Sequence, residues 1–526
     1  MRGFLTTPAG SRRSQRFFFV GVTWGSLVLS ACSAREANDT SGVEGTGAGG
    51  MGGAGAGGTG ASPAGGHAPE GVPELIAVAA SEGPFETAAA PDLDASPQVV
   101  EIRLEAHPAE VEVAPGRIVS LWTYNGQLPG PRIEANVGDT VRVHFKNSLP
   151  EPTTIHWHGL RVPAEMDGSP SVQPPIAPGE EFTYEFVVPD AGTFWYHPHV
   201  RSDEQVERGL YGAFVVRGPE EPEVTTERTV VLDDLLVDEE WQLRDFDFDS
   251  AQALLGRQGN VLLANGWAHP ITRVARGGLH RFRFINAANA RYFRLALPGH
   301  RLLQIGTDGG FVTQPQQIDE VLLVPGERAD VLVLTDGEVG ETVEWKALRH
   351  NRGLGTGKQP DAELFRMVHD GEERVQAPEP PSGFAQVPAL PEPTALRELS
   401  FQGVSQTSEH MGHPMPSHAA EPLFTIVQTV PAGVPSRAKL EDVEEWTVVN
   451  ATMMDHPFHL HGYRFQLVPD QEPAGFPTWR DTINVPAGQA AKFRVRFEDH
   501  AGLWMFHCHI LEHAERGMMG ELEVVP

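Results

Sequence analysis

The stretch "VGDTVRVHFKNSLPEPTTIHWHG" (residues 137–159) alternates apolar and polar residues and then ends in two histidines that are one residue apart. Such alternation is typical of a β-strand with one buried face. A later stretch, "EDVEEWTVVNATMMDHPFHLHG" (441–462), shows the same features in the same order. Aligned on Asn147 and Asn450, both reach His-x-His-Gly after nine residues. The chain therefore contains at least two copies of one β-rich unit.

A third copy lies between these two. In "HRFRFINAANARYFRLALPG" (280–299), Leu295 and Leu297 follow Asn286 at the offsets where the other copies carry histidines. From about residue 96 the chain consists of short strand-like stretches separated by Gly, Pro and Asp, without a convincing long amphipathic helix. This texture predicts an all-β protein built from sandwiches or barrels.

A second motif is repeated in the first and last copies only. "AGTFWYHPH" (191–199) and "AGLWMFHCH" (501–509) both reach His-x-His five residues after the glycine. Further on, "ERGLYG" (207–212) corresponds to "ERGMMG" (515–520). Pro198 thus stands opposite Cys508, and Leu210 stands opposite Met518. Only the last copy carries the cysteine and the methionine.

Four His-x-His pairs indicate a metal cluster. Residues i and i+2 of a strand face the same way, so each pair directs two imidazoles to one side. One isolated pair is commonly just two surface or core histidines, but four pairs at repeated offsets favour a transition-metal site, and without thiolates they suit copper or zinc. The pairs are His156 and His158, His197 and His199, His459 and His461, and His507 and His509.

Cys508 points to the opposite face of its strand from His507 and His509. His513 follows it by five residues and Met518 by ten, and His456 stands three residues before His459, an offset that lets it diverge from the 459/461 pair. Two histidines, one cysteine and a methionine are the ligands of a blue copper centre. A lone Cys508 would be interpreted as a small buried hydrophobe. Together with these two histidines and the methionine, Cys508 predicts a second metal site, joined to the cluster by one short strand.

The motifs "HWHG", "HPH", "HPFHLHG" and "HCHILEHAERGMM" resemble the four copper motifs of the multicopper oxidases, which include laccases, bilirubin oxidases and cuprous oxidases. "PGERADVLV" (325–333) also resembles the middle domain of that family. The resemblance covers about residues 96–526. It implies three consecutive cupredoxin-like Greek-key β-barrel or sandwich domains, which we expect at 96–220, 221–375 and 376–526, with the trinuclear cluster between the first and third.

The resemblance also implies which residues bind each of four copper ions. The type 1 copper would be held by His456, Cys508, His513 and Met518, and the type 2 copper by His156 and His459. The type 3 pair would be held by His158, His197, His199, His461, His507 and His509. The implied reaction takes four single electrons from a reducing substrate and reduces dioxygen to two waters. All ligand positions are filled, which favours an active enzyme.

Oxygen reduction also requires protons. Asp167 matches an acidic residue that is thought to serve the cluster in bacterial members, although an Asp before Gly168 could simply form a turn. Many bacterial members have Glu directly after the histidine that matches His513, whereas this chain has Ala514 and then Glu515, which resembles fungal laccases. Cys508, Asp167 and Glu515 are therefore the candidate catalytic residues.

The natural reductant stays open at this stage. Phenols and aromatic amines fit a type 1 copper whose methionine ligand implies a low-to-middling potential. Cuprous oxidation in copper tolerance is the alternative, and "EHMGHPMPSH" (409–418) would then be an exposed loop that gathers Cu(I), or else a polar loop with chance methionines. A non-enzymatic copper-binding envelope protein is a third reading. A copper nitrite reductase is disfavoured, because that family lacks the full set of type 3 ligands that this chain has.

The first 32 residues predict an export signal. Arginines precede the fifteen-residue apolar run at 17–31, which is shorter than the roughly 20 residues of a membrane span. The run ends in "LSAC", which resembles a bacterial lipobox and implies lipidation of Cys32 and a cell-envelope or periplasmic location; an ordinary signal peptide with a chance cysteine is the alternative. "SRRSQRF" (11–17) resembles a twin-arginine signal except at Gln15, so the export route stays open.

Glycine-rich composition predicts a disordered tether over residues 33–95. The net charge of −30 argues against binding to nucleic acid or to anionic membrane surfaces. We therefore expect a monomer whose contact with the membrane is limited to the lipid at Cys32, and whose partners are dioxygen and a small reductant such as a phenol, an aromatic amine or Cu(I).

Overall fold

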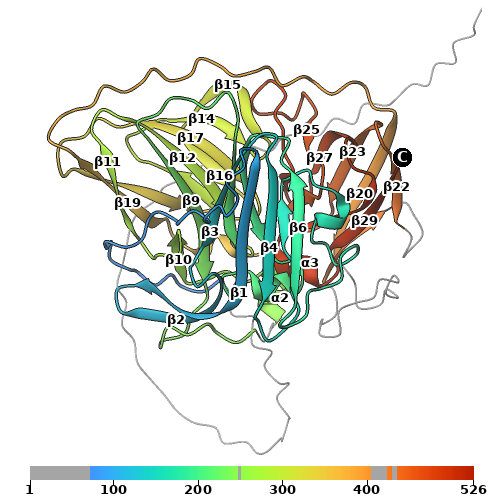
Figure 1. Cartoon of the computed structure of the whole chain (residues 1–526), viewed down its shortest axis with the longest axis horizontal. Helices are drawn as coiled ribbons and strands as arrows, with labels where there is room; N and C mark the ends of the chain where they lie inside the picture. Colours follow the sequence, from blue (N-terminus) through green and yellow to red (C-terminus); the bar gives the residue numbers. More distant parts are fainter. Residues whose placement is uncertain (1–71, 247–249, 404–422, 429–434) are drawn as a thin grey trace, which may run out of the picture. The chain divides into compact units, whose positions relative to one another are not determined.

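The computed structural model describes residues 72–246, 250–403, 423–428 and 435–526 (Figure 1). The predicted signal peptide, the lipid site at Cys32 and the loop at 409–418 lie outside the described residues. Among the residues that are described, no helix has the length and apolar character needed to cross a membrane. The described chain is almost entirely β-structure in six sheets, which confirms the predicted all-β class.

The first segment forms two four-stranded sheets. The first sheet contains β1 (Val99–Ala114), β2 (Arg117–Tyr124), β4 (Thr140–Asn147) and β6 (Glu181–Val187) in the order β2-β1-β4-β6. The second contains β3 (Gly130–Asn136), β5 (His156–His158), β7 (Gly192–His197) and β8 (Gly212–Arg217) in the order β3-β8-β7-β5. The short helices η1 (Ala164–Met166) and α1 (Ser202–Gln205) connect strands of this segment.

The middle segment forms a six-stranded and a five-stranded sheet. The larger contains β9 (Thr226–Leu235), β10 (Val261–Ala264), β12 (Leu279–Asn286), β14 (Leu302–Thr307), β15 (Gly310–Ile318) and β17 (Arg328–Leu334) in the order β10-β9-β12-β17-β14-β15. The smaller contains β11 (Ile271–Ala275), β13 (Phe293–Ala296), β16 (Glu320–Leu323), β18 (Thr342–Leu348) and β19 (Ala362–Asp370) in the order β11-β19-β18-β13-β16. Its helices are α2 (Ser250–Leu255) and η2 (Thr356–Lys358).

The last segment forms two five-stranded sheets. One contains β20 (Ala395–Gly403), β21 (Phe424–Gln428), β23 (Val443–Asn450), β25 (Phe465–Leu467) and β27 (Ala490–Arg496) in the order β21-β20-β23-β27-β25. The other contains β22 (Ser436–Lys439), β24 (His456–Leu460), β26 (Thr482–Val485), β28 (Gly502–Cys508) and β29 (Met519–Val525) in the order β22-β29-β28-β24-β26. Helix α3 (Leu511–Glu515) follows β28. No described sheet mixes strands of different segments, and a separate apolar cluster fills each segment.

The three asparagines used to align the repeats have one structural role. Each is buried at the end of a strand, where its side-chain oxygen accepts the N–H of the residue two positions later: Leu149, Ala288 or Thr452. Each amide nitrogen donates to two backbone carbonyls, one four or five residues later and one on a distant stretch. The predicted threefold repeat is therefore present at the level of hydrogen bonds.

The strand register repeats as well. His156 on β5 lies opposite His197 on β7, and His459 on β24 lies opposite His507 on β28. In the middle segment the equivalent place on β13 is Leu295, which lies opposite Ala347 on β18. The same pair of neighbouring strands thus presents imidazoles in two segments and aliphatic side chains in the third.

The prediction of a disordered tether over residues 33–95 is wrong for its last part, from residue 72 onward. From residue 72 onward the chain packs against the middle segment: the N–H of Ile76 donates to the carbonyl of Asn260 at 2.7 Å. The ring of Phe85 is buried 5.1 Å from that of Phe365. Glycine-rich composition ends before this point, and the apolar residues that follow have enough surface to bury. The remainder of the predicted tether lies outside the described residues.

Candidate metal centres

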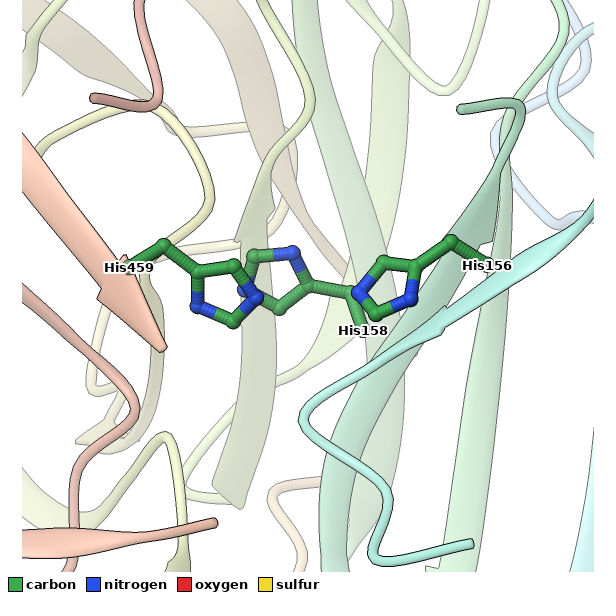
Figure 2. A group of neighbouring side chains, drawn as sticks. All are labelled: His156, His158 and His459. Atoms are coloured by element: carbon green, nitrogen blue, oxygen red, sulfur yellow. The ribbon is translucent and has the colours of Figure 1, made fainter. Parts of the chain in front are cut away.

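The eight histidines of the four His-x-His pairs are buried together. Ring nitrogens of His158, His197 and His509 lie within 4.8 Å of one another, and so do those of His199, His461 and His507. A further triad joins His156, His158 and His459, which point toward one another in Figure 2. The rings of His158 and His459 are stacked with 3.8 Å between centroids. Two segments of the chain thus contribute to one imidazole cluster.

Hydrogen bonds hold one ring nitrogen of most cluster histidines and leave the other for a metal. Nδ1 donates to a backbone carbonyl in His156, His197, His459 and His507 at 2.8–3.0 Å. Within the described chain, the opposite Nε2 atoms of His156, His197 and His459 are buried without a hydrogen-bond partner, as is Nδ1 of His158. Buried imidazole nitrogens without partners are costly, and a bound metal removes that cost. The donor set therefore fits a metal cluster.

Burial keeps these imidazoles in the neutral form that binds metals. It is the largest cause of lowered pKa values in His158, His197, His199, His459, His461, His507 and His509, and neighbouring imidazoles lower most of them further. The pKa of His507 falls to about 3. Protons therefore compete only weakly with a metal at neutral pH.

Asp167 is in contact with the cluster. Its carbonyl accepts Nδ1–H of His156 at 2.9 Å, and its carboxylate Oδ2 lies 2.9 Å from Nδ1 of His461. Burial alone raises the pKa of Asp167, but His461 and His156 outweigh it and hold the pKa well below its ordinary value. Its other carboxylate oxygen, Oδ1, lies 3.3 Å from Nδ1 of His156. The residue also ends the η1 turn before Gly168, so the turn role and the cluster role coincide.

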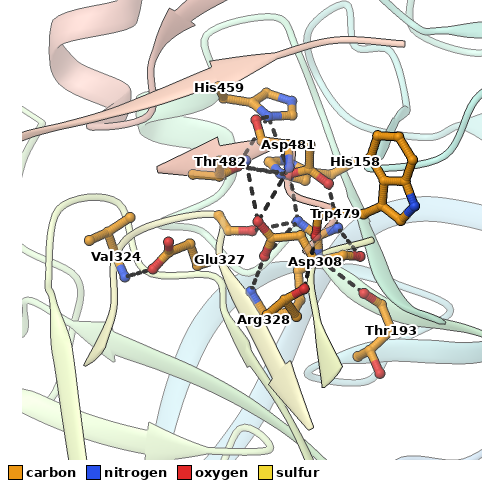
Figure 3. Close-up of polar contacts among 12 residues, drawn as sticks. His158, Thr193, Asp308, Val324, Glu327, Arg328, His459, Trp479, Asp481 and Thr482 are labelled. Atoms are coloured by element: carbon orange, nitrogen blue, oxygen red, sulfur yellow. Dashed lines mark hydrogen bonds and ion pairs between the residues drawn. The ribbon is translucent and has the colours of Figure 1, made fainter. Parts of the chain in front are cut away.

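A second carboxylate, which the sequence reasoning missed, lies on the other side of the cluster. Asp481 Oδ1 lies 3.1 Å from Nε2 of His158, and its backbone carbonyl accepts Nδ1–H of His459. Figure 3 shows its link to the middle segment, where Arg328 donates two hydrogen bonds to the Asp481 carboxylate at 2.6 and 2.7 Å. The backbone N–H of Arg328 donates in turn to Asp308.

The second predicted site surrounds Cys508. Its sulfur lies 3.5 Å from Nδ1 of His456 and 3.7 Å from Nδ1 of His513. The other ring nitrogens are held, Nε2 of His456 by the hydroxyl of Thr452 and Nε2 of His513 by the carbonyl of Leu254 on α2. Met518 is fully buried in the apolar cluster that contains Cys508. Burial raises the pKa of the Cys508 thiol.

One strand connects the two sites. Cys508 and His507 end β28, and Phe458 and His459 lie opposite them on β24. His507 donates from Nδ1 to the backbone carbonyl of Cys508 at 2.8 Å. A group bound at the sulfur is therefore separated from the imidazole cluster by a few covalent bonds.

Glu515 lies at the contact between α3 and α1 rather than among the metal-facing triads described above. Its carboxylate accepts hydrogen bonds from the N–H and the hydroxyl of Ser202, at 2.7 and 2.8 Å. Two acids that the sequence reasoning did not select are buried nearby, Asp203 and Glu512. Burial and the charge of Glu515 raise the pKa of Asp203. Each acid lies in the short stretch between the two repeated motifs of its segment, where no spacing rule singles it out.

Comparison with known proteins supports this reading. Three family profiles described as multicopper oxidase match residues 106–221, 230–342 and 404–526. The chain is 31% identical to a multicopper oxidase of Mycobacterium tuberculosis over 82% of this chain and 88% of the relative. The chain therefore belongs to the multicopper oxidase family, and its fold is three consecutive cupredoxin-like domains.

Two further similar proteins are a laccase and a structurally characterised oxidase. A laccase of Bacillus stratosphericus is 28% identical over 77% of this chain and 91% of the relative. The solved structure of a multicopper oxidase from Campylobacter jejuni, described as a metallo-oxidase, matches with a TM-score of 0.74 and 31% identity over 87% of this chain and 99% of that one. The protein is a copper-dependent oxidase, and copper is the metal that the histidine and cysteine donors fit.

Proposed function

We propose that this oxidase couples the one-electron oxidation of phenols or aromatic amines to the four-electron reduction of dioxygen to water. The observation that carries the proposal is the adjacency of two complete donor sets, with Cys508 directly between His507 and His509. Copper supplies one-electron transfer at the cysteine site and oxygen reduction at the histidine cluster. The chain supplies the short backbone connection between them.

Protein residues would also handle protons and hold the cluster in place. We assign the proton-related role to Asp167, because its two carboxylate oxygens face two cluster histidines, Oδ2 toward His461 and Oδ1 toward His156. Glu515, the other candidate, has one oxygen committed to Ser202. Asp481 and Arg328 would orient His158 and His459 from the opposite side.

One observation favours Cu(I) as a second candidate substrate. His513 is only 2% exposed, and its Nε2–H is directed at the carbonyl of Leu254 rather than at solvent. A bulky phenol therefore cannot touch the imidazole edge while α2 is in place. A small reductant that delivers electrons without contacting the ring is less affected.

Oxygen uptake by the copper-loaded protein tests both candidates. We would measure kcat/KM with a dimethoxyphenol, an aromatic diamine and Cu(I) under one set of conditions, after confirming four coppers per chain. A second protein, in which Ser250–Leu255 is replaced by six Gly and Ser residues, opens the cover over His513. Uptake with phenols by the parent supports the first candidate. Uptake with Cu(I) alone, with phenol activity appearing only in the opened variant, supports the second, and uptake with none of the three overturns both.

The location of the enzyme is a separate proposal. We propose export and lipid anchoring through Cys32, on the strength of the basic, apolar and "LSAC" sequence that precedes it. Labelling of the full chain with a fatty acid in a bacterial host, beside Cys32→Ala, tests this. Equal labelling of the two chains would refute the anchor.

A further inference from the structure

Arg352 is a buried cation beside the cysteine site. It lies between β18 and η2 in the middle segment and is 2% exposed. One arm of its guanidinium, Nη2, donates to the carbonyl of Leu255, whereas Nε and Nη1 have no hydrogen-bond partner in the described chain. A cavity of about 30 Å³ adjoins the side chain, which is room for water but not for a neutralising side chain. A buried charge without a directly bound carboxylate is expensive, so it needs an explanation.

Two links fix Arg352 next to the predicted type 1 ligands. The consecutive carbonyls of Leu254 and Leu255 bind Nε2 of His513 and the Arg352 guanidinium respectively. On the other side, the carbonyl of Arg352 accepts the N–H of Asp455 at 2.7 Å, one residue before His456. The guanidinium therefore belongs to the wall of the cysteine site although it comes from the middle segment.

Among the described residues, the surroundings of the guanidinium leave its charge largely uncompensated. The guanidinium carbon lies 5.8 Å from the centre of the Tyr292 ring, which is a neutral contact. The carboxylates of Glu512 and Asp455 are hydrogen-bonded elsewhere, Glu512 to Asn289 and Asp455 to Asn484 and the N–H of Ala487.

The electrostatic consequence has a definite sign. An electron that arrives at a copper site lowers its positive charge by one unit. A fixed cation nearby repels the oxidised site more than the reduced site, and the weak screening of a buried location preserves this difference. The cation therefore stabilises the reduced form.

We propose that Arg352 raises the reduction potential of the type 1 copper and thereby determines which reductants the enzyme can oxidise. The inference rests on the proposed function in one respect, the assignment of Cys508 and its neighbours as the type 1 site. Arg352 acts as a positioning and electrostatic residue rather than as a ligand.

The test is an equilibrium redox titration of the blue absorption band in the copper-loaded protein. Arg352→Gln keeps a donor for Leu255 but removes the charge, and Arg352→Lys keeps the charge. We expect Arg352→Gln to shift the oxidised-to-reduced ratio about tenfold toward the oxidised form at a given mediator potential, which equals about 59 mV for one electron. Arg352→Lys should stay within about threefold of the parent on the same scale.

Two further variants complete the design. Arg349→Gln removes an exposed cation from the same loop, and solvent screening should leave the potential unchanged. The buried Thr356 hydroxyl accepts the backbone N–H of Arg352. Thr356→Asp puts a negative charge at this position, close to Arg352, and should lower the reduction potential even if Arg352→Gln fails to fold.

The outcomes separate two failures. If the four-copper parent has no blue band, the type 1 assignment is wrong and this inference falls with it. If the parent is blue but Arg352→Gln and Thr356→Asp match its potential, only the role of Arg352 is overturned. Equal drops in Arg352→Gln and Arg352→Lys would assign the effect to the shape of the guanidinium rather than to its charge, and would also overturn the charge argument.

Discussion

At the scale of single residues, the histidines of the two sites are oriented before any metal arrives. The carbonyls of Asp167 and Asp481 hold His156 and His459 by Nδ1, and Thr452 and Leu254 hold the rings beside Cys508 by Nε2. Fixing one nitrogen sets the tautomer and direction of the other. The copper-free protein should therefore bind copper without large rearrangement of these side chains.

Replacing Cys508 by Ser should abolish the intense blue absorption and leave most of the cluster copper in place. A hydroxyl cannot replace the covalency of a thiolate, whereas the cluster donors are imidazoles. Copper analysis and visible spectroscopy of the variant and the parent check this. A variant that remains blue would show that Cys508 is not the type 1 ligand.

Asp167→Asn should slow oxygen reduction by roughly 10–100-fold and leave the reduction of the type 1 copper by substrate unchanged. The amide keeps an oxygen for His461 but loses the charge and the ability to pass on a proton. Stopped-flow reduction and reoxidation of the blue band separate the two steps. Glu515→Gln is the matched comparison, and if both variants reoxidise like the parent, neither acid serves the reaction.

Ligand positions could be predicted from the sequence because they repeat at fixed offsets along strands. The oxygens that orient them could not, because most are backbone carbonyls, such as that of Leu254, and every residue has one. Asp481 was also missed, since nothing in its immediate sequence distinguishes it from an ordinary strand-preceding Asp. Its importance arises only when β24 and β26 come together.

At the scale of elements, the recurring unit is a strand that ends in a buried asparagine. Three hydrogen bonds from one side chain close the turn that follows β4, β12 and β23. In the last copy the turn has an added task, because Thr452 contacts both Asn450 and Nε2 of His456. The same turn therefore stabilises only the fold in the middle segment, whereas in the last segment it also orients the predicted ligand His456.

Asn286→Ala and Asn450→Ala should each lower the free energy of unfolding by roughly 2–4 kcal/mol, because each leaves buried carbonyls unpaired. Only Asn450→Ala should also change the blue spectrum, through Thr452 and His456. Chemical denaturation and visible spectra of the two variants check this. An altered spectrum in Asn286→Ala would contradict the assigned difference.

Composition alone misplaced one element. The frequent glycines led to one predicted tether over residues 33–95. The glycine-rich part ends earlier, however, and Phe85, which follows it, is buried against the middle segment. Short segments that pack as isolated bridges, such as the one between Ser81 and Pro270, have no periodic pattern that would reveal them.

At the scale of the whole molecule, the middle segment carries none of the predicted ligands, yet its residues contact both sites. Arg328 holds Asp481 behind the cluster, and Gly326 approaches the rings of His158 and His509 so closely that an added Cβ would lie 3.0 Å from each. The leucines at its repeat positions predict that this segment binds no copper, but they could not predict these contacts, because the partners are far apart in sequence.

Arg328→Met should reduce the copper content of the cluster as well as the stability of the protein. It leaves Asp481 buried without its cation, which typically costs 3–5 kcal/mol, and loosens the support of His158 and His459. Arg283→Met is the control, because Arg283 is a buried cation of the same segment whose partner Asp330 is also bound by Arg281. We expect some destabilisation from both variants, measured by denaturation, but full copper loading only in Arg283→Met; full loading in both would refute the role of Arg328.

The union of distant histidines also has a consequence for the order in which the protein is made. His199 and His507 approach within 3.4 Å although they are 308 residues apart in sequence. A ribosome therefore releases the first four cluster histidines long before their partners exist, and Cys508 follows seven of the eight. A chain that stops before the last copy lacks Cys508 and has only four of the eight cluster histidines. Both metal sites can therefore form only after the last segment has been synthesised.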